Sequence, residues 1–353
     1  MKIKLAILEK DANYLSRIVT VFSTKYADKF QVYSFTDPNI ALSALQPERI
    51  DVLLANDGFE IDPDSIPKRC SFAYFVDSAD VDTVNDCAAI CKFQKAELIY
   101  KQILSIYSET AASIGGVSLS DGTCKVITFS SPVGGTGTSS VAAACALYHA
   151  QRGKKVMFLS FDNFGASDIF FSGEGQFDMS DVIFAIKSRK PNLAMKLESY
   201  VKQDPRGVFF YSKTKYALDM LELKHAEKMQ LLNELQILGS YDYIIIDADF
   251  AYDKDHFELY RKSNAIVMVS DGSEIANLKT DRAYSALITI DQSAEVPVAN
   301  RFMLIYNKYS SKGATPVAND DIKIIGGAPV YAHATVAQII AQLATLPVFD
   351  KID

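Results

Sequence analysis

The chain has 353 residues, of which 49% are hydrophobic and 22% charged, an ordinary globular composition with enough residues for two domains. Its formal net charge of −7 argues against broad, nonspecific binding of nucleic acid, which needs a concentrated positive field. No apolar run reaches the roughly 18 residues of a membrane span. Five cysteines without paired spacing predict structural thiols in a reducing cytoplasm.

The N-terminal part alternates short apolar strands with helical periods, the pattern of an α/β domain with a parallel sheet. Residue 1 leads almost directly into the first strand, so we expect no signal peptide. The predicted strands cover residues 3–8, 30–35, 50–56, 72–76 and 90–93. The interval 78–92 is short, which predicts that a helix there is reduced or missing. An amphipathic helix then closes this part of the chain.

This order of elements resembles a response-regulator receiver, in which carboxylates hold Mg²⁺ beside a phosphorylatable aspartate. Here Asn56 occupies the aspartate position, Lys10 replaces one of the two acids beside Glu9, and Lys92 matches the receiver's lysine. A carboxamide is a poor nucleophile and cannot form an acyl phosphate. We therefore predict a receiver-like scaffold without phosphotransfer, used as a docking surface. The alternative is an active receiver that uses Asp57, which a mass gain with acetyl phosphate would reveal.

Small and polar residues dominate positions 108–123, which predict a flexible linker. The sequence thus divides into a receiver-like domain at residues 1–107, the linker at 108–123 and a second domain at 124–353. The second domain repeats the alternation of strands and helices, so the predicted class is α/β, with a mostly parallel sheet, throughout.

A glycine-rich loop, residues 130–140, joins a strand-like run to a helix of small residues. A strand, a glycine-rich turn and a helix aim backbone N–H groups at a phosphate. The predicted nucleotide-binding residues here are Gly134, Gly135, Thr136, Gly137, Thr138, Ser139 and Ser140. A standard phosphate loop ends Gly-Lys-Ser/Thr, whereas this loop has Thr138 where the lysine belongs. The hydroxyl of Ser139 is the predicted ligand of Mg²⁺.

The loop spacing resembles the deviant Walker A loop of the ParA/MinD family, with Val133 and Thr138 at the positions of its two lysines. Residues 153–162 resemble the strand that ends in Asp-x-Asp, of which only Asp162 is kept. Residues 241–247 read as a Walker B strand that ends in Asp247. The resemblance implies a P-loop NTPase domain that binds ATP and Mg²⁺. Asp247 would hold the ion through water, and Asp162 is the candidate that orients the attacking water.

Residues 302–308 resemble the strand whose terminal asparagine, here Asn307, reads adenine in this family. Tyr331 is a further candidate beside the base. Loss of one charge-assisted hydrogen bond costs roughly 1.5–3 kcal/mol, which several amides and Mg²⁺ can outweigh. Loss of a cation at the transferring phosphoryl costs about 10³–10⁵ in rate. We expect ATP retention with slow or absent hydrolysis, unless Lys308 or a partner subunit supplies the cation.

A degenerate receiver followed by a deviant ParA/MinD-like domain resembles the TadZ/CpaE family of localisation factors. The resemblance implies a homodimer linked to ATP, attachment at a cell pole on the inner face of the membrane, and recruitment of a Flp/Tad-type pilus secretion apparatus through the receiver-like domain. The C-terminal residues form no basic amphipathic tail, so we expect no membrane helix there. The alternatives are an active ParA/MinD-type ATPase in DNA partitioning or spatial positioning, and a signalling protein controlled by phosphorylation.

Overall fold

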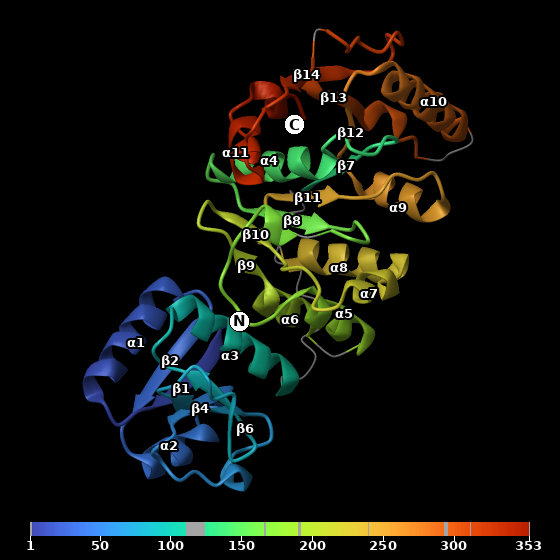
Figure 1. Cartoon of the computed structure of the whole chain (residues 1–353). Coiled ribbons are helices and arrows are strands. Elements are labelled where there is room, and N and C mark those ends of the chain that lie inside the picture. Colours follow the sequence, from blue (N-terminus) through green and yellow to red (C-terminus); the bar gives the residue numbers. More distant parts are fainter. Residues whose placement is uncertain are drawn as a thin grey trace. The chain divides into compact units, whose positions relative to one another are not determined.

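Figure 1 shows the computed structural model of the chain, which describes residues 2–110, 124–165, 167–189, 192–238, 240–292, 296–310 and 312–352. Residue contacts divide the chain into two compact units. Unit 1 holds the elements from β1 to α3 together with α6, and unit 2 holds the others from β7 onward. Both units are α/β, as predicted. Across the described ranges, every helix is too short or too polar to cross a bilayer.

Unit 1 contains a six-stranded sheet in the order β2-β1-β3-β4-β6-β5, parallel except for the pairing of β5 with β6. Its elements are β1 (Ile3–Leu8), α1 (Ala12–Lys25), β2 (Phe30–Phe35), α2 (Pro38–Leu45), β3 (Val52–Asn56), η1 (Pro63–Ser65), β4 (Ser71–Val76), β5 (Thr83–Val84), β6 (Cys87–Cys91), α3 (Ala96–Thr110) and α6 (Leu193–Tyr200). Side chains alternate along β1, so Leu5 and Ile7 join the core under α1 and α3, while Ala6 and Leu8 join the core under α2.

The hairpin of β5 and β6 stands where the receiver pattern would place its fourth helix. Asn85 and Asp86 form its two-residue turn with positive φ angles of 48° and 60°. Two successive positive φ angles are typical of the type I′ turn, whose twist matches that of the paired strands. The prediction that a helix is missing from residues 78–92 is therefore confirmed, since all of these residues are described.

Helix α6 comes from the sequence between two elements of unit 2, yet it packs in unit 1. Met195 packs against the same core cluster as Tyr100 of α3. Lys196 is 6% exposed, and its Nζ lies 2.7 Å from Glu109 Oε1. Burial, followed by the negative charge of Glu198, raises the pKa of the Tyr100 hydroxyl. A helix from the second half of the sequence thus completes the first unit, which a linear division of the sequence does not foresee.

The predicted linker, residues 108–123, lies outside the described residues from position 111 onward. Its first three residues end α3. The linear boundaries at residues 107 and 124 therefore stay a prediction.

Lys196→Ala is expected to loosen α6, because the substitution removes a buried stem as well as the ion pair with Glu109. Glu109 is 53% exposed, so the ion pair is screened and the total loss is about 1 kcal/mol. Hydrogen exchange of the α6 amides should then accelerate about fivefold. Glu109→Gln removes the charge that pairs with Lys196 and keeps the aliphatic part of the Lys196 side chain, so it should accelerate hydrogen exchange less. Equal effects of the two substitutions would contradict the stem-packing argument.

Unit 2 contains an eight-stranded sheet in the order β14-β13-β12-β7-β11-β8-β10-β9, parallel except for the pairing of β9 with β10. Its strands are β7 (Lys125–Ser130), β8 (Val156–Ser160), β9 (Lys202–Gln203), β10 (Val208–Phe210), β11 (Tyr243–Asp247), β12 (Ala265–Ser270), β13 (Phe302–Tyr309) and β14 (Ile324–Pro329). Its helices are α4 (Thr138–Ala150), η2 (Ser167–Ile169), α5 (Met179–Lys187), α7 (Ala217–Glu222), α8 (His225–Leu238), α9 (Lys254–Lys262), α10 (Glu274–Asp291), η3 (Ala299–Arg301), α11 (Val336–Leu343) and η4 (Pro347–Ile352).

Helices cover both faces of this sheet, with α4 and α11 on one side and α9 and α10 on the other (Figure 1). Residues 141–149 of α4 are all buried, and its run of alanines lets the helix pack closely against the sheet and α11. Strand β7 has β11 and β8 on one side and β12 and β13 on the other. The chain therefore reverses direction across the sheet at β7, and ligands bind at such a switch point, outside the carboxyl ends of the strands.

Candidate nucleotide-binding site

The loop between β7 and α4 holds its shape through its own residues. Gly135 and Gly137 have φ angles of +81° and +85°, where a side chain costs about 1–2 kcal/mol. Ser131 Oγ donates to Val269 O at 2.7 Å, which ties the loop to the end of β12. Thr136 Oγ1 donates to Ser131 Oγ at 3.2 Å. Gly137 caps α4, so the helix N-terminus with its partial positive charge opens at this loop.

An open pocket of about 440 Å³ lies beside the loop. This is within the roughly 300–1,000 Å³ of small-molecule sites. Six of the seven predicted loop residues line the pocket, and Thr136, which is 1% exposed, does not. The ends of β8, β11 and β13 contribute the other walls, through Asp162, Asp247 and Lys308 among others.

Ser139 and Asp247 meet at this pocket, although they are far apart in the sequence. The Ser139 hydroxyl lies beside the carboxylate of Asp247, which is 4% exposed. Burial, together with the charges of Asp162 and Asp249, raises the pKa of Asp247 to about 7, and the Ser139 hydroxyl acts to lower it. A nearby cation would favour the ionised carboxylate. The pair therefore fits Mg²⁺, which commonly takes one or two carboxylates together with phosphate oxygens.

The pocket wall is acidic overall. Asp162, Asp247 and Asp249 all line it, whereas Lys308 is the single cationic side chain among the described residues that do so. Val133 and Thr138 line the pocket at the two positions where the sequence pattern lacks lysine. Within the described ranges, no three His, Cys, Asp or Glu side chains converge as a ready-made metal site. The carboxylates of this wall would repel a triphosphate, and a divalent cation would offset that repulsion.

The other two predicted binding residues lie outside the pocket lining. Asn307 is 3% exposed, and its Nδ2 donates to Thr136 O at 2.7 Å. Tyr331 is half-buried and packs against the main core of unit 2. The roles of both side chains beside adenine remain predictions, and in this structure the amide of Asn307 serves the loop.

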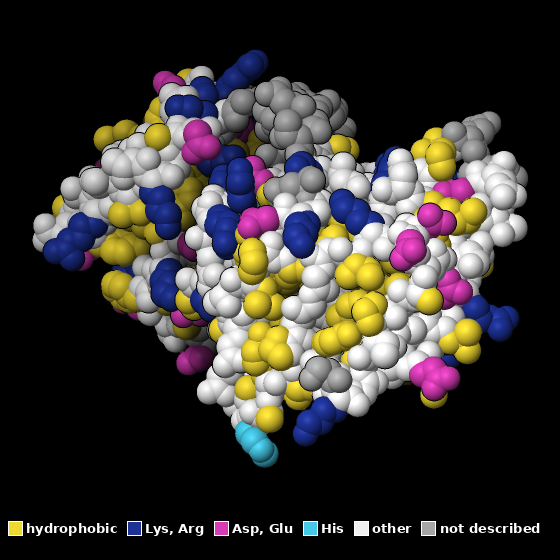
Figure 2. Space-filling view, turned by 90° about the horizontal axis from the view of Figure 1, so that it is seen from above, with side chains coloured by type: hydrophobic (Ala, Val, Ile, Leu, Met, Phe, Trp, Pro, Cys, Tyr) yellow, Lys and Arg dark blue, Asp and Glu magenta, His cyan; other side chains and the backbone are white. Residues whose placement is uncertain are grey.

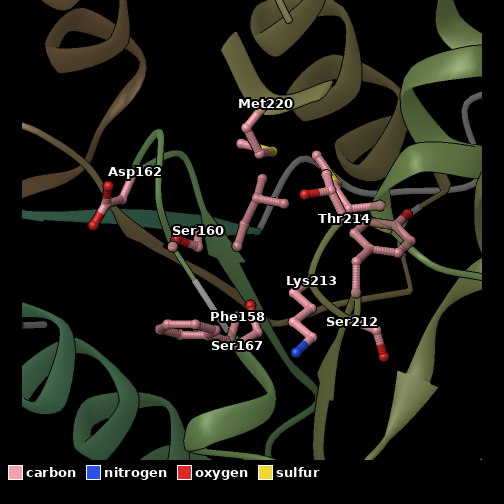
Figure 3. A pocket seen from close by; sticks show the side chains of 12 residues that line it. Phe158, Ser160, Asp162, Ser167, Ser212, Lys213, Thr214 and Met220 are labelled. Atoms are coloured by element: carbon pink, nitrogen blue, oxygen red, sulfur yellow. The ribbon is translucent and has the colours of Figure 1, made fainter. Parts of the chain in front are cut away.

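A second, smaller cavity adjoins Asp162 (Figure 3). Ser160, at the position of the first aspartate of Asp-x-Asp, lines it, and its buried Oγ has no hydrogen-bond partner among the described residues. In Figure 3, Asp162 stands at one edge, on the far side of Ser160 from Lys213. Asp162 Oδ1 accepts from Phe164 N at 2.9 Å, so its own loop orients it. Its role in orienting water stays a prediction.

In unit 1, side chains of the protein occupy the place where a receiver would hold its metal. Asn56 Nδ2 donates to Glu9 Oε2 at 3.2 Å, and Lys92 Nζ lies 3.6 Å from the same carboxylate oxygen. Lys92 also lies 2.7 Å from Asp77 Oδ1. Lys10 Nζ donates to Gly58 O. Glu9 is thus surrounded by an amide and an ammonium, which supports the prediction of a receiver-like scaffold without phosphotransfer.

Comparison with known proteins agrees with the fold of each unit. Residues 1–108 match the family described as TadZ-like, receiver domain. The chain resembles the crystal structure of a ParA family ATPase from Chlorobium tepidum TLS at 20% identity and a TM-score of 0.50, covering 66% of this chain and 96% of that one. It also resembles a chain of the MinC:MinD cell division protein complex of Aquifex aeolicus at 19% identity and a TM-score of 0.48, covering 65% of this chain and 92% of that one. No curated protein sequence matches the chain.

These features define a protein with a receiver-like domain followed by a domain of the ParA/MinD P-loop NTPase fold. The TadZ-like receiver domain and the ParA-like fold together fit a TadZ/CpaE-like protein. The family resemblance and the fold predicted from the sequence are thereby confirmed.

Sequence reasoning missed Ala248, Asp249 and Phe250, which also line the pocket. These three residues follow Asp247 directly, so a signal was present in the three positions after the Walker B strand. The sequence indicated Lys308 only as one possible source of a cation. Its hydrogen bond to the loop was not predicted, because that contact depends on how β13 ends.

Proposed function

We propose that unit 2 binds ATP together with Mg²⁺, and that the nucleotide is retained with weak or no hydrolysis. Backbone N–H groups of the loop would hold the phosphates, and Ser139 with Asp247 would hold the ion. Bound Mg²⁺ would neutralise phosphate charge. The observation that carries this proposal is the hydroxyl–carboxylate pair beside a loop whose glycines already have left-handed backbone angles.

Binding should depend strictly on Mg²⁺, because three carboxylates and one ammonium line the pocket. Charges about 4 Å apart interact by about 4 kcal/mol near a protein surface, which corresponds to roughly 10²–10³ in affinity. Calorimetry should therefore detect ATP with Mg²⁺ and lose at least about 100-fold in affinity with EDTA. Asp247→Ala should show the same loss with Mg²⁺ present, and Asp320→Ala, at an exposed position, should not. Equal affinity with and without Mg²⁺ would contradict the proposed metal site.

Hydrolysis should be slow, because neither loop position carries a lysine that could stabilise charge on the transferring phosphoryl. The runner-up function, an active ATPase that partitions DNA or positions other molecules, predicts phosphate release stimulated by DNA, lipid or a protein partner. A turnover rate above roughly 1 s⁻¹ would favour this alternative. Figure 2 shows acidic side chains interspersed among lysines and arginines on the face that it draws, which gives that alternative's DNA partner little support.

At the level of the cell, we propose a positioning factor that dimerises with bound ATP, sits at a cell pole in the cytoplasm and recruits a Flp/Tad-type pilus apparatus through unit 1. The match of residues 1–108 to a TadZ-like receiver domain supports this assignment. The proposed localisation is better tested with full-length tagged protein that carries substitutions at Asp247 or in unit 1 than by deletion of residues 1–107. Such a deletion would strip α6 of its packing partner α3. Uniform distribution of the wild-type protein in its native cell would contradict the proposal.

A further inference from the structure

Strand β13 ends irregularly beside the phosphate loop. Its pairing with β14 shifts register between Tyr306 and Tyr309. Lys308, inside that shift, has a φ angle of +57°, which is uncommon for a residue with a side chain. Such a conformation is strained and persists only where its surroundings hold it. Irregular strand ends of this kind are frequent next to functional sites, where they redirect side chains.

The irregular end lets two neighbouring side chains reach the same loop. In a regular strand, Asn307 and Lys308 would point to opposite faces of the sheet. Here Asn307 Nδ2 donates to Thr136 O at 2.7 Å, and Lys308 Nζ donates to Gly135 O at 2.8 Å. The two accepting carbonyls are consecutive in the loop. Thr136 is buried, so its carbonyl needs a partner within the protein, and Asn307 supplies it. Lys308 adds a cationic donor at the more exposed carbonyl of Gly135.

Strand order indicates which end of the ligand Lys308 faces. Ser139 and Asp247 would hold the metal, which in enzymes of this chemistry would neutralise charge on the terminal phosphates. A terminal phosphate would therefore lie toward β11 and β8, whose ends carry Asp247 and Asp162. Strand β13 lies on the opposite side of β7, two positions away. Lys308 thus stands at the end of the pocket away from the phosphate that hydrolysis would transfer.

We propose that Asn307 and Lys308 are positioning residues that clamp the carbonyls of Thr136 and Gly135 and so hold the loop ready for nucleotide. The clamp rests on the proposed function, because it prepares the same loop for ATP. It orders the loop, and it leaves the role of the missing loop lysines at the terminal phosphate unfilled. Lys308 should therefore contribute equally to the affinity for ATP and to the affinity for ADP.

The test compares Lys308→Met, Lys308→Arg and Lys308→Gly, with Lys323→Met as a matched control at an exposed lysine. Calorimetry with MgATP and MgADP should show about a tenfold loss for Lys308→Met, equal for the two nucleotides. Lys308→Arg keeps a cationic donor and should recover most of the affinity. Lys308→Gly removes the backbone strain as well as the donor, so its equal loss of affinity would separate the clamp from global destabilisation.

Hydrogen exchange of residues 134–138 without nucleotide provides the second readout. It should be about tenfold faster in Lys308→Met and Lys308→Gly, and near wild type in Lys308→Arg and Lys323→Met. Loss of ATP affinity well beyond that of ADP would place Lys308 at the terminal phosphate and overturn the proposal. Unchanged exchange would also overturn it. If the wild-type protein binds no nucleotide and the Lys308→Met loop still exchanges faster, the clamp is supported and the proposed function is refuted.

Discussion

Gly137→Val should weaken nucleotide binding by about 100-fold or more. The backbone at Gly137 has a φ angle of +85°, where a β-branched side chain is strongly disfavoured. A Cβ atom there would also lie 2.5 Å from Asn307 Nδ2, closer than real contacts allow. The added side chain would therefore push away the amide that holds Thr136, and distort the loop from behind. Calorimetry with MgATP measures the loss.

Gly153→Val is the matched control for this substitution. Gly153 has a φ angle of +77°, and a Cβ atom there would meet nothing within 4 Å. It does not line the pocket. The control thus carries similar backbone strain without the clash, and it should keep nucleotide affinity while losing some stability. If both substitutions abolish binding, or neither does, the loop geometry described above does not govern nucleotide affinity.

Lys92→Met should destabilise unit 1 by about 3–5 kcal/mol, because it leaves the Glu9 carboxylate buried without a cation. Although burial acts to lower it, the hydrogen bond and charge of Asp77 and the charge of Glu9 raise the pKa of Lys92 above its usual range. The stabilisation is therefore complete at neutral pH and is lost only as the pH rises above about 10.4. Hydrogen exchange of the β1 and β3 amides should accelerate by about 10²–10⁴.

Two further variants test the origin of this loss. Glu9→Gln in the Lys92→Met background removes the uncompensated charge and keeps an acceptor for the N–H of Lys10, so it should restore much of the stability. Lys29→Met breaks an ion pair whose lysine is 50% exposed, and should cost under about 1 kcal/mol. If the double substitution is no more stable than Lys92→Met alone, lost packing rather than an unpaired charge accounts for the effect.

Much of the fold was predictable because its signals are local. Apolar runs of strand length, separated by helical periods, predict parallel α/β units, and the short interval before Lys92 predicts the absence of a helix there. The loop glycines predict a turn that needs positive φ angles, which Gly135 and Gly137 have. The placement of α6 was not predictable, since its apolar residues indicate a buried face without indicating which helix covers it.

The candidate site divides in the same way. Residues that adjoin in the loop, such as Gly134 and Ser139, line the pocket together because one strand–turn–helix segment carries them. The sequence also placed Asp247 at a strand end, and parallel strands bring such ends to one edge of a sheet. Only the folded chain decided that Lys308 reaches the carbonyl of Gly135, because this contact depends on a register shift at the end of β13. A register shift is set by the pairing of β13 with β14, and no local pattern in the sequence specifies that pairing.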